Sequence, residues 1–512
     1  MRLHSQHLLG VGLTASRRDD VVTQRARLRR ELRRLDTIFF LISAMVAVDT
    51  VGAIAVGGAQ AFTWLLVLFV TFFVPSALAN AELGAAIPVE GGAYVWVRMA
   101  MGRFAGALTS LLYWAGTPMW LGGSLTVVGL AVFERSFTEL DTFGSLVFGV
   151  LFVGGATVGA IVPLRYGKWL PSTGAVGQIV LLAFFTASTI AYGAAHGFHG
   201  IAGGDFAPSW AVFIAIVPIL LYSFVGIELP SSAAEEMVDP RRDIPIAIGR
   251  AGVGQLLMYA VPILAVLVVL PLERLTSLHG LIDAMRTVFT VYGGSVAADG
   301  AVTLTGLGAV FGAIGGVVFI VVLFASGTAW IMGAGRSQAA ACLDGAGPAV
   351  FGRISPRTGV PVVMGLISGG FSMATMVGYL LATDGDSQQY FSVGLTVAVS
   401  LIVLAYLFIF PTFAILRIRR PDLARPFRAP GGVGTAIAIS VISTAWATLA
   451  AVCLLWPGFG TADPDAALPA GFEGQRARFE LMVLTPVLAM VPICVLLLWW
   501  GASSGRERPA AE

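Results

Sequence analysis

Long apolar runs alternate with short polar connections along this chain of 512 residues. Twelve of the runs come close to the roughly 20 residues that an α-helix needs to cross a bilayer. The expected spans are residues 36–57, 62–84, 103–133, 143–163, 170–195, 210–230, 247–271, 305–340, 360–382, 390–416, 433–456 and 481–501. The third, eighth and tenth are longer than one bilayer, so these helices should tilt or project beyond it. The pattern predicts an all-α integral membrane protein with twelve transmembrane helices.

The sixth run is interrupted in its apolar middle, where Gly226, Glu228 and Pro230 stand close together. Pro230 has no N–H to bond the carbonyl of Gly226, and its ring disfavours helical geometry at Leu229. Bare backbone groups are costly in hydrocarbon, so a broken helix persists only where it lines a cavity in the protein. A break beside an acid therefore predicts a transporter binding site. A proline kink packed against neighbouring helices is the alternative.

The first run carries a related segment around an acid of its own. Residues 49–52 read Asp-Thr-Val-Gly and residues 225–228 read Val-Gly-Ile-Glu, so each run sets Val-Gly beside a carboxyl group. The two segments lie five helices apart along the chain, which gives them opposite orientations, as an inverted repeat requires. We therefore expect breaks near residues 49–52 and 226–229.

The basic residues indicate the orientation. With the N-terminus inside, 26 of the 31 lysines and arginines fall in inner loops and tails and five in outer loops. Positive charge is enriched on the cytoplasmic side of membrane proteins. The chain is expected in the plasma membrane as a multi-pass protein with both termini cytoplasmic. Lys168 is its only lysine, which is typical of a GC-rich bacterial genome.

Composition narrows the class of function. Hydrophobic residues make up 57% of the chain and charged residues 12%, which is typical of a membrane protein. Cys342, Cys453 and Cys494 have no metal-binding spacing, and no catalytic or metal-binding constellation occurs. We expect no enzyme activity, metal or cofactor. No aromatic residues interleave the N-terminal arginines, so no nucleic-acid partner is expected. An intramembrane enzyme and a non-transporting sensor are the competing classes.

Three motifs resemble those of the amino acid–polyamine–organocation (APC) superfamily of permeases. They are AELG at 81–84 with PVEGGAYVWV at 88–97, SFVGIE at 223–228 with the acidic–basic loop to residue 245, and RPFRAP at 425–430. Among members, the loop and helix 6 resemble those of bacterial glutamate/γ-aminobutyrate antiporters and their uncharacterised relatives. The resemblance implies two inverted five-helix repeats with broken helices 1 and 6, and two peripheral helices.

The resemblance also implies a function and an organisation. The function is secondary active transport of amino acids by alternating access, as a permease or antiporter; cationic amines or polyamines are the alternative substrates. The expected parts are an arginine-rich cytoplasmic tail (1–35), the transport core (36–416), a basic cytoplasmic loop (417–432), helices 11 and 12 (433–501) and a cytoplasmic C-terminal tail (502–512).

The implied substrate site lies between the two broken helices, where free amides suit a carboxylate and free carbonyls suit an ammonium group. The predicted substrate-binding residues are Val48, Asp49, Thr50, Val51, Gly52, Tyr222, Ser223, Phe224, Val225 and Gly226. Tyr113 and Glu228 match family positions linked to gating or proton sensing. Two features depart from the family: residues 49–52 replace a frequent Gly-Ser-Gly, and the fifth helix lacks the mid-membrane lysine of some proton-coupled members.

Asp49 has two interpretations. It either caps the second half of helix 1, or it faces the cavity as a counter-charge for a cationic substrate or as a proton carrier. Glu82 and Glu90 lie near the inner interface, where a structural or gating role is expected. Trp114 and Trp120 are expected to pack between helices. Besides a small-molecule substrate, the expected partner is the lipid bilayer; proton coupling and homo-oligomer formation are left open.

Overall fold

The structure, a computed structural model, describes residues 21–198, 200–268, 278, 280–297 and 300–503. Within these residues, eleven helical stretches are long and apolar enough to cross a membrane. The twelfth expected span, the sixth along the chain, is present as a broken helix. The predicted all-α membrane fold is confirmed. The N-terminal tail through residue 20, the end of the seventh expected span (269–271) and the C-terminal tail after residue 503 lie outside the described residues.

Each of the first five spans contains one or two helices. They are α3 (Arg34–Met45) with α4 (Val51–Ala55); α5 (Gly58–Leu68) with α6 (Val74–Ala86); α8 (Arg103–Trp120) with α9 (Thr126–Ser136); α10 (Thr142–Ile161); and α11 (Leu164–Gly167) with α12 (Trp169–His196). The helix α7 (Ala93–Met101) lies between the second and third spans. Single π-helical turns, Phe69–Phe73 and Leu121–Leu125, interrupt the second and third spans.

The remaining spans follow in the same manner. They are α13 (Trp210–Tyr222) with α14 (Leu229–Ser232), α15 (Pro240–Leu267), α17 (Gly306–Ala341), α18 (Val362–Ala382), α19 (Ser387–Arg419), α20 (Val433–Leu455) and α21 (Arg476–Ser503). Between α15 and α17 the chain forms α16 (Gly280–Phe289) and the antiparallel hairpin of β1 (Gly294–Val296) and β2 (Val302–Leu304).

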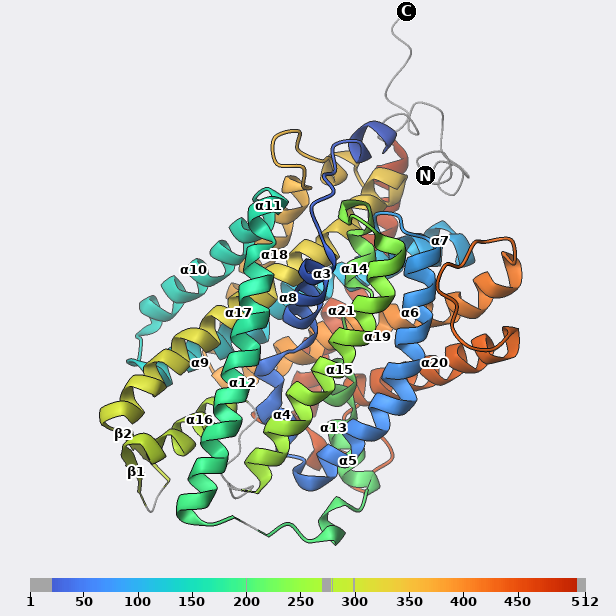
Figure 1. Ribbon diagram of the computed structural model, residues 1–512. Helices are drawn as coiled ribbons and strands as arrows, with labels where there is room; N and C mark the ends of the chain where they lie inside the picture. Colours follow the sequence, from blue (N-terminus) through green and yellow to red (C-terminus); the bar gives the residue numbers. More distant parts are fainter. Residues whose placement is uncertain (1–20, 199, 269–277, 279, 298–299, 504–512) are drawn as a thin grey trace, which may run out of the picture.

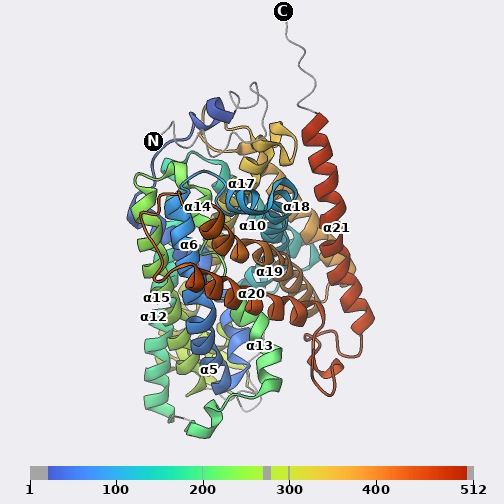
Figure 2. The ribbon, with the colours of Figure 1, turned by 90° about the vertical axis from the view of Figure 1, so that its right-hand side faces the viewer.

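The helices are not equally buried. In the first span 89% of the most apolar window is buried inside the protein, against 22% in α21. Figure 1 shows α3 beside α12, α15 and α17, whereas Figure 2 shows α21 standing at one edge of the molecule. Leu481, Leu488 and Trp499 of α21 are exposed. Exposed apolar side chains in such number suit a helix that faces lipid.

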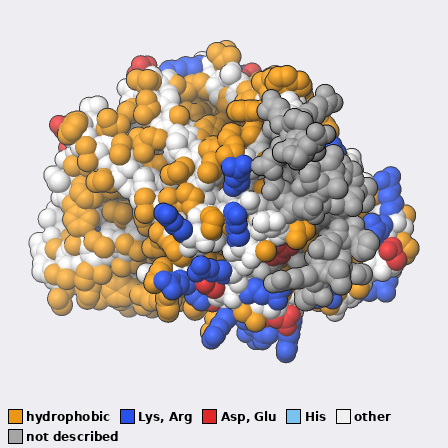
Figure 3. Space-filling view, turned by 90° about the horizontal axis from the view of Figure 1, so that it is seen from above, with side chains coloured by type: hydrophobic (Ala, Val, Ile, Leu, Met, Phe, Trp, Pro, Cys, Tyr) orange, Lys and Arg blue, Asp and Glu red, His pale blue; other side chains and the backbone are white. Residues whose placement is uncertain are grey.

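The described chain begins and ends at the same end of the molecule, the upper end in Figures 1 and 2. We call it the arginine-rich end. Figure 3 looks onto it and shows Lys and Arg side chains gathered there. Its exposed arginines include Arg29, Arg30, Arg103, Arg242, Arg353, Arg357 and Arg428.

The break in helix 6 lies where the sequence predicts it. The helix α13 ends at Tyr222 and α14 begins at Leu229, so residues 223–228 form a non-helical connection. Gly226 takes φ +101°, a left-handed conformation that is costly for residues with a Cβ. The Trp330 ring also lies 3.3 Å from where a Cβ would stand. Pro230 is the second residue of α14 and lies in its first turn, where a missing N–H costs nothing.

The break in helix 1 lies a few residues before the predicted position. The helix α3 ends at Met45, and Val46 and Ala47 are not helical. One 3-10 turn, Val48–Thr50, leads into α4. Gly52 therefore lies inside α4, and its missing side chain serves packing: a Cβ there would stand only 2.9 Å from the Cα of Gly280.

Candidate substrate site

Side chains from three other helices satisfy the carbonyls that end α3. Trp330 of α17 donates its indole N–H to the carbonyl of residue 44 at 2.8 Å. Gln255 of α15 donates to that of residue 45 at 3.1 Å, and Gln178 of α12 to that of residue 46 at 2.7 Å. Because a buried backbone group needs a partner, these three donors stabilise a helix break that contains no proline.

Two residues of α15 connect the broken helices. The hydroxyl of Tyr259 accepts a hydrogen bond from the N–H of Ala47 at 2.9 Å and lies 3.3 Å from Oγ1 of Thr50. The amide of Gln255 also donates to the carbonyl of Ser223 in the helix 6 break. A substrate ammonium that binds these carbonyls must therefore displace side-chain donors already present.

Asp49 lies between the breaks with one oxygen unpaired. Its side chain is 4% exposed. Trp120 donates its indole N–H to Oδ2 at 3.4 Å. The second oxygen, Oδ1, is buried and has no hydrogen-bond partner among the described residues. The helix α4 has no side-chain cap, so the geometry does not support the capping interpretation of Asp49.

A row of aromatic rings begins at Trp120, which contacts this carboxyl group. Trp120 and Trp330 lie 6.1 Å apart, and Tyr113 lies 5.8 Å from Trp330. Tyr222 is close enough to Asp49 to interact electrostatically. Trp120 is buried between helices as expected, and it also contacts Asp49. Ring faces attract cations, and an acid beside them adds a full charge.

The two residues predicted to gate or carry a proton come together. Glu228 is fully buried, and the Tyr406 hydroxyl lies 3.0 and 3.2 Å from its two oxygens. That hydroxyl also accepts a hydrogen bond from the N–H of Gly226 at 3.2 Å. Tyr113 lies beside Glu228. The break in helix 6 is thus tied to α19 through one phenol.

The other predicted residues are buried but differ in their contacts. The hydroxyls of Thr50 and Ser223 donate to the backbone of their own helices, at 2.7 and 3.0 Å. The ring of Phe224 lies 5.5 Å from that of Phe73 in helix 2. Val48, Val51 and Val225 contribute buried apolar side chains.

Five residues that no motif marks complete the site: Gln178, Tyr259, Gln255, Trp330 and Tyr406. Each lies within an expected span, and each carries a polar group. Polar groups inside a membrane seek partners within the bundle. A glutamine within an otherwise apolar run is the sequence feature that could have identified Gln178 and Gln255. The three aromatic residues have no comparable feature.

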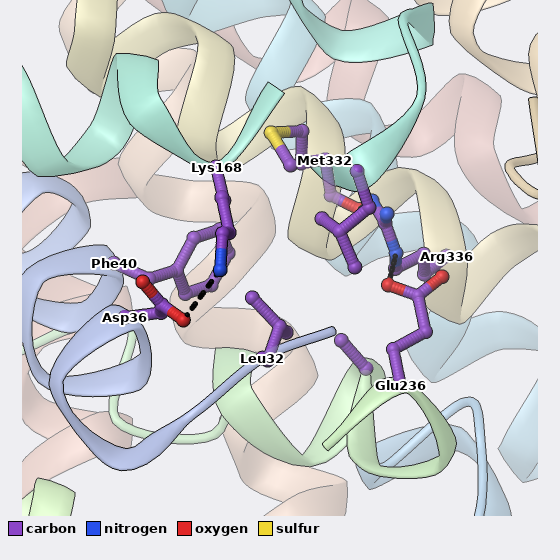
Figure 4. A pocket seen from close by; sticks show the side chains of 9 residues that line it. Leu32, Asp36, Phe40, Lys168, Glu236, Met332 and Arg336 are labelled. Carbon is purple, nitrogen blue, oxygen red and sulfur yellow. Dashed lines mark hydrogen bonds and ion pairs between the residues drawn. The ribbon is translucent and has the colours of Figure 1, made fainter. Parts of the chain in front are cut away.

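Ion pairs join the helices at the arginine-rich end. Lys168, between α11 and α12, pairs with Asp36 of α3 at 2.9 Å, and Arg336 of α17 pairs with Glu236, after α14, at 2.9 Å. Figure 4 shows both pairs facing one small pocket with Leu32 between them. The pairs hold the two broken helices against the start of α12 and α17, and we call this packed arrangement the closed conformation of the arginine-rich end.

Glu82, expected to be structural or gating, anchors a loop. Arg417 forms a bidentate pair with it, and Arg425 pairs at 3.0 Å. The N–H of Ala429 donates to the same carboxylate at 2.8 Å. Glu82 is 1% exposed. These contacts tie the loop after α19 to α6.

Metal ligands do not gather in the described part of the chain. No group of three or more His, Cys, Asp or Glu residues there could hold a metal ion. The three cysteines are buried and unbridged, as expected of small apolar residues.

Comparisons with known proteins agree with this architecture. A probable agmatine/putrescine antiporter, AguD, of Lactococcus lactis is 25% identical over 404 residues, covering 78% of this chain and 82% of that protein. An uncharacterized transporter of Legionella pneumophila is 25% identical over 431 residues, covering 78% and 85%.

A solved structure supports the fold. The manganese transporter of Eremococcus coleocola, in complex with an aromatic bis-isothiourea substituted compound, superposes with a TM-score of 0.57 at 13% identity. The match covers 92% of this chain and 94% of that chain. The identity is too low to carry function, so this likeness concerns the fold alone.

The family model described as amino acid permease matches residues 32–466. That range contains both broken helices, Asp49 and Glu228, and it spans most of the chain. The relatives and the family are transporters and not enzymes. The chain therefore belongs to the amino acid permease family of the APC superfamily, and it is a multi-pass membrane transporter of small molecules.

Proposed function

We propose that this protein is a secondary transporter of small organic cations derived from amino acids, such as diamines and guanidino amines. It works by alternating access in the cytoplasmic membrane of a bacterium, with the arginine-rich end inside. The observation that carries the proposal is the unpaired carboxylate oxygen of Asp49 among aromatic rings.

Charge distinguishes the substrate classes. Two unit charges at about 4 Å interact by about 4 kcal/mol in a partly shielded protein site. An ionised Asp49 attracts an ammonium or guanidinium group with an energy of that order. It repels the carboxylate of an amino acid. Trp120 and Trp330 add cation–π attraction. The agmatine/putrescine assignment of the AguD relative agrees with this preference.

Amino acids are the second candidate. The start of α4 carries the positive end of a helix dipole, which suits a carboxylate, although the N–H groups of Thr50 and Val51 already donate to the carbonyls of Ala47 and Val48. The name of the matching family model favours this substrate class. An amino acid would then place its ammonium at Asp49 and its carboxylate towards α4.

Glu228 is proposed as the proton-linked residue of the site, with Tyr113 and Tyr406 as its partners. A carboxyl group in such a site is costly unless it is neutral or well bonded. Because the Tyr406 hydroxyl also holds the Gly226 N–H, a protonation change at Glu228 reaches the break in helix 6 directly.

The orientation and membrane are proposed from the charges. The topology expected from the sequence assigns 26 of the 31 lysines and arginines to the side of the chain termini, and the positive side of a bacterial inner-membrane protein faces the cytoplasm. Reaction of single surface cysteines at positions 29 and 143 with an impermeant thiol reagent on whole cells tests this. Labelling at 143 alone supports the orientation, and labelling at 29 alone reverses it.

A thermal-shift panel tests the substrate class. Putrescine, agmatine, γ-aminobutyrate and neutral amino acids are added to the purified wild type and to Asp49→Asn. Asp141→Asn is the matched control, because Asp141 is an exposed helix cap and Asn also caps well. We expect amines to stabilise the wild type and the control but not Asp49→Asn. Stabilisation by neutral amino acids alone would favour the second candidate.

A further inference from the structure

A cluster of acidic and basic side chains lies at the arginine-rich end, about Glu90. Glu90 belongs to the turn that joins α6 and α7. Its side chain is 5% exposed, and its Oε2 has no hydrogen-bond partner among the described residues. It lines a small pocket with Arg25 and Arg336. The substrate site proposed above does not use this cluster.

Four segments meet at the cluster. The chain before α3 contributes Arg25, and the segment after α14 contributes Glu235 and Glu236. The helix α17 contributes Arg336. The chain before α3 runs beside the segment after α14, since the N–H groups of residues 31 and 32 both donate to the carbonyl of Glu236 at 3.0 Å.

Two glycines bring the Glu90 turn against helix 6. Gly91 and Gly92 have φ +103° and +47°. A Cβ on Gly92 would stand 2.9 Å from the backbone of Ser231. The N–H of Gly91 donates to the carbonyl of Ser232 at 3.3 Å. The PVEGG motif therefore fixes Glu90 directly beside the end of the broken helix.

The carboxyl groups outnumber their partners. Arg25 pairs with Glu235 at 2.8 Å and Arg336 pairs with Glu236 at 2.9 Å. Neither arginine pairs with the Glu90 side chain: Nη2 of Arg25 donates to the Glu90 backbone carbonyl at 3.4 Å, and Nη2 of Arg336 is buried without a hydrogen-bond partner among the described residues. Glu90 is therefore the third carboxyl group beside two guanidinium groups. A fourth acid, Glu31, faces Glu236 from the chain before α3. An unpaired carboxylate that is buried and next to other carboxylates is strongly disfavoured in its ionised form.

We propose that Glu90 binds a proton at the arginine-rich end while this end is closed, and loses it when water enters. The carboxyl group is then neutral in the closed conformation, and its proton passes to the water that fills the opening. Burial raises the pKa of Glu90 well above its usual range, and the nearby carboxylates of Glu236 and Glu235 raise it further against the opposing effect of Arg336 and Arg25.

This inference sets a direction for pH. The closed conformation binds more protons than the open one, so lower pH at the arginine-rich end favours closure and higher pH favours opening. The device is separate from Glu228, which lies at the break of helix 6. The relevance of Glu90 to transport rests on the proposed function, but proton binding by Glu90 does not.

Infrared spectroscopy of the full-length protein in lipid nanodiscs tests the proposal without substrate. The C=O stretch of a protonated carboxyl group is followed from mildly acidic to alkaline pH. We expect one such band to be missing in Glu90→Gln at neutral pH. Asp36→Asn, which alters a paired acid at the same end, should retain it. An unchanged band in Glu90→Gln overturns the proposal.

Glu236→Gln gives an independent test if Glu90→Gln does not fold. This change removes a neighbouring negative charge and frees Arg336 for Glu90. Both effects favour ionised Glu90, so its band should vanish at lower pH than in the wild type. An unshifted titration overturns the proposal. Because no ligand is added, failure of amine transport would leave these results intact, and an unchanged spectrum would not affect the substrate assignment.

Discussion

The Tyr406 hydroxyl is predicted to hold the break in helix 6 together. It is bonded to Glu228 and to the N–H of Gly226, and all three groups are buried. Tyr406→Phe keeps the ring and removes only the oxygen. The N–H of Gly226 and the carboxyl group of Glu228 then each lose a partner in a site that water does not reach.

The expected cost follows from those two groups. A buried polar group left without its partner costs about 1–3 kcal/mol. For hydrogen bonds between membrane helices the cost lies at the low end of this range, because polar groups of the unfolded chain in the bilayer also find hydrogen-bond partners. The low end for two groups gives a loss of about 2 kcal/mol in the free energy of unfolding.

Unfolding in mixed lipid–detergent micelles, titrated with SDS, measures this loss. Tyr166→Phe is the matched control, because its ring is 58% exposed, and it should change the unfolding free energy by less than about 0.5 kcal/mol. If Tyr406→Phe costs no more than Tyr166→Phe, the hydroxyl does not support the break, and the reasoning is refuted.

Three further predictions concern the buried acids. Glu228→Gln should fold normally and flatten the pH dependence of proteoliposome uptake; wild-type pH dependence would assign Glu228 to structure. Glu82→Gln removes the charge that Arg417 and Arg425 share, so thermal unfolding should show a loss of about 3–5 kcal/mol, and a loss under 1 kcal/mol would contradict the buried pairing. Because burial raises the pKa of Glu90 in the folded protein, the native state binds more protons than the unfolded state above the usual carboxyl pKa. The stability of the wild type should therefore fall as pH rises through the raised pKa, and that of Glu90→Gln should fall less steeply. If the melting temperatures of the two proteins change with pH in parallel, Glu90 does not bind the extra proton.

Local chemistry accounts for the parts of the fold that the sequence predicts. Apolar length gives the spans, and Pro230 with Gly226 gives the break in helix 6, since both act through their own backbone. The break in helix 1 is harder to place. Its carbonyls are satisfied by Trp330, Gln178 and Gln255, which lie far along the chain. Only the packing of α12, α15 and α17 fixes where α3 ends.

The candidate site shows the same division. The sequence identifies Asp49 and Glu228 because an acid inside a membrane is costly wherever it lies. It does not reveal the partner of either acid. Trp120 and Tyr406 reach them from other helices, and an aromatic residue in an apolar run is usually a packing residue. Whether Asp49 capped a helix or faced a cavity therefore depended on tertiary contacts.

Counterflow tests the central assignment most directly. Proteoliposomes are loaded with unlabelled putrescine, and entry of labelled putrescine is compared among the wild type, Asp49→Asn and Asp141→Asn. The wild type and Asp141→Asn should accumulate label. Loss of an attraction of about 4 kcal/mol should lower the rate in Asp49→Asn by at least about tenfold. Undiminished putrescine exchange by Asp49→Asn, or wild-type exchange of neutral amino acids but not of putrescine, would contradict the account.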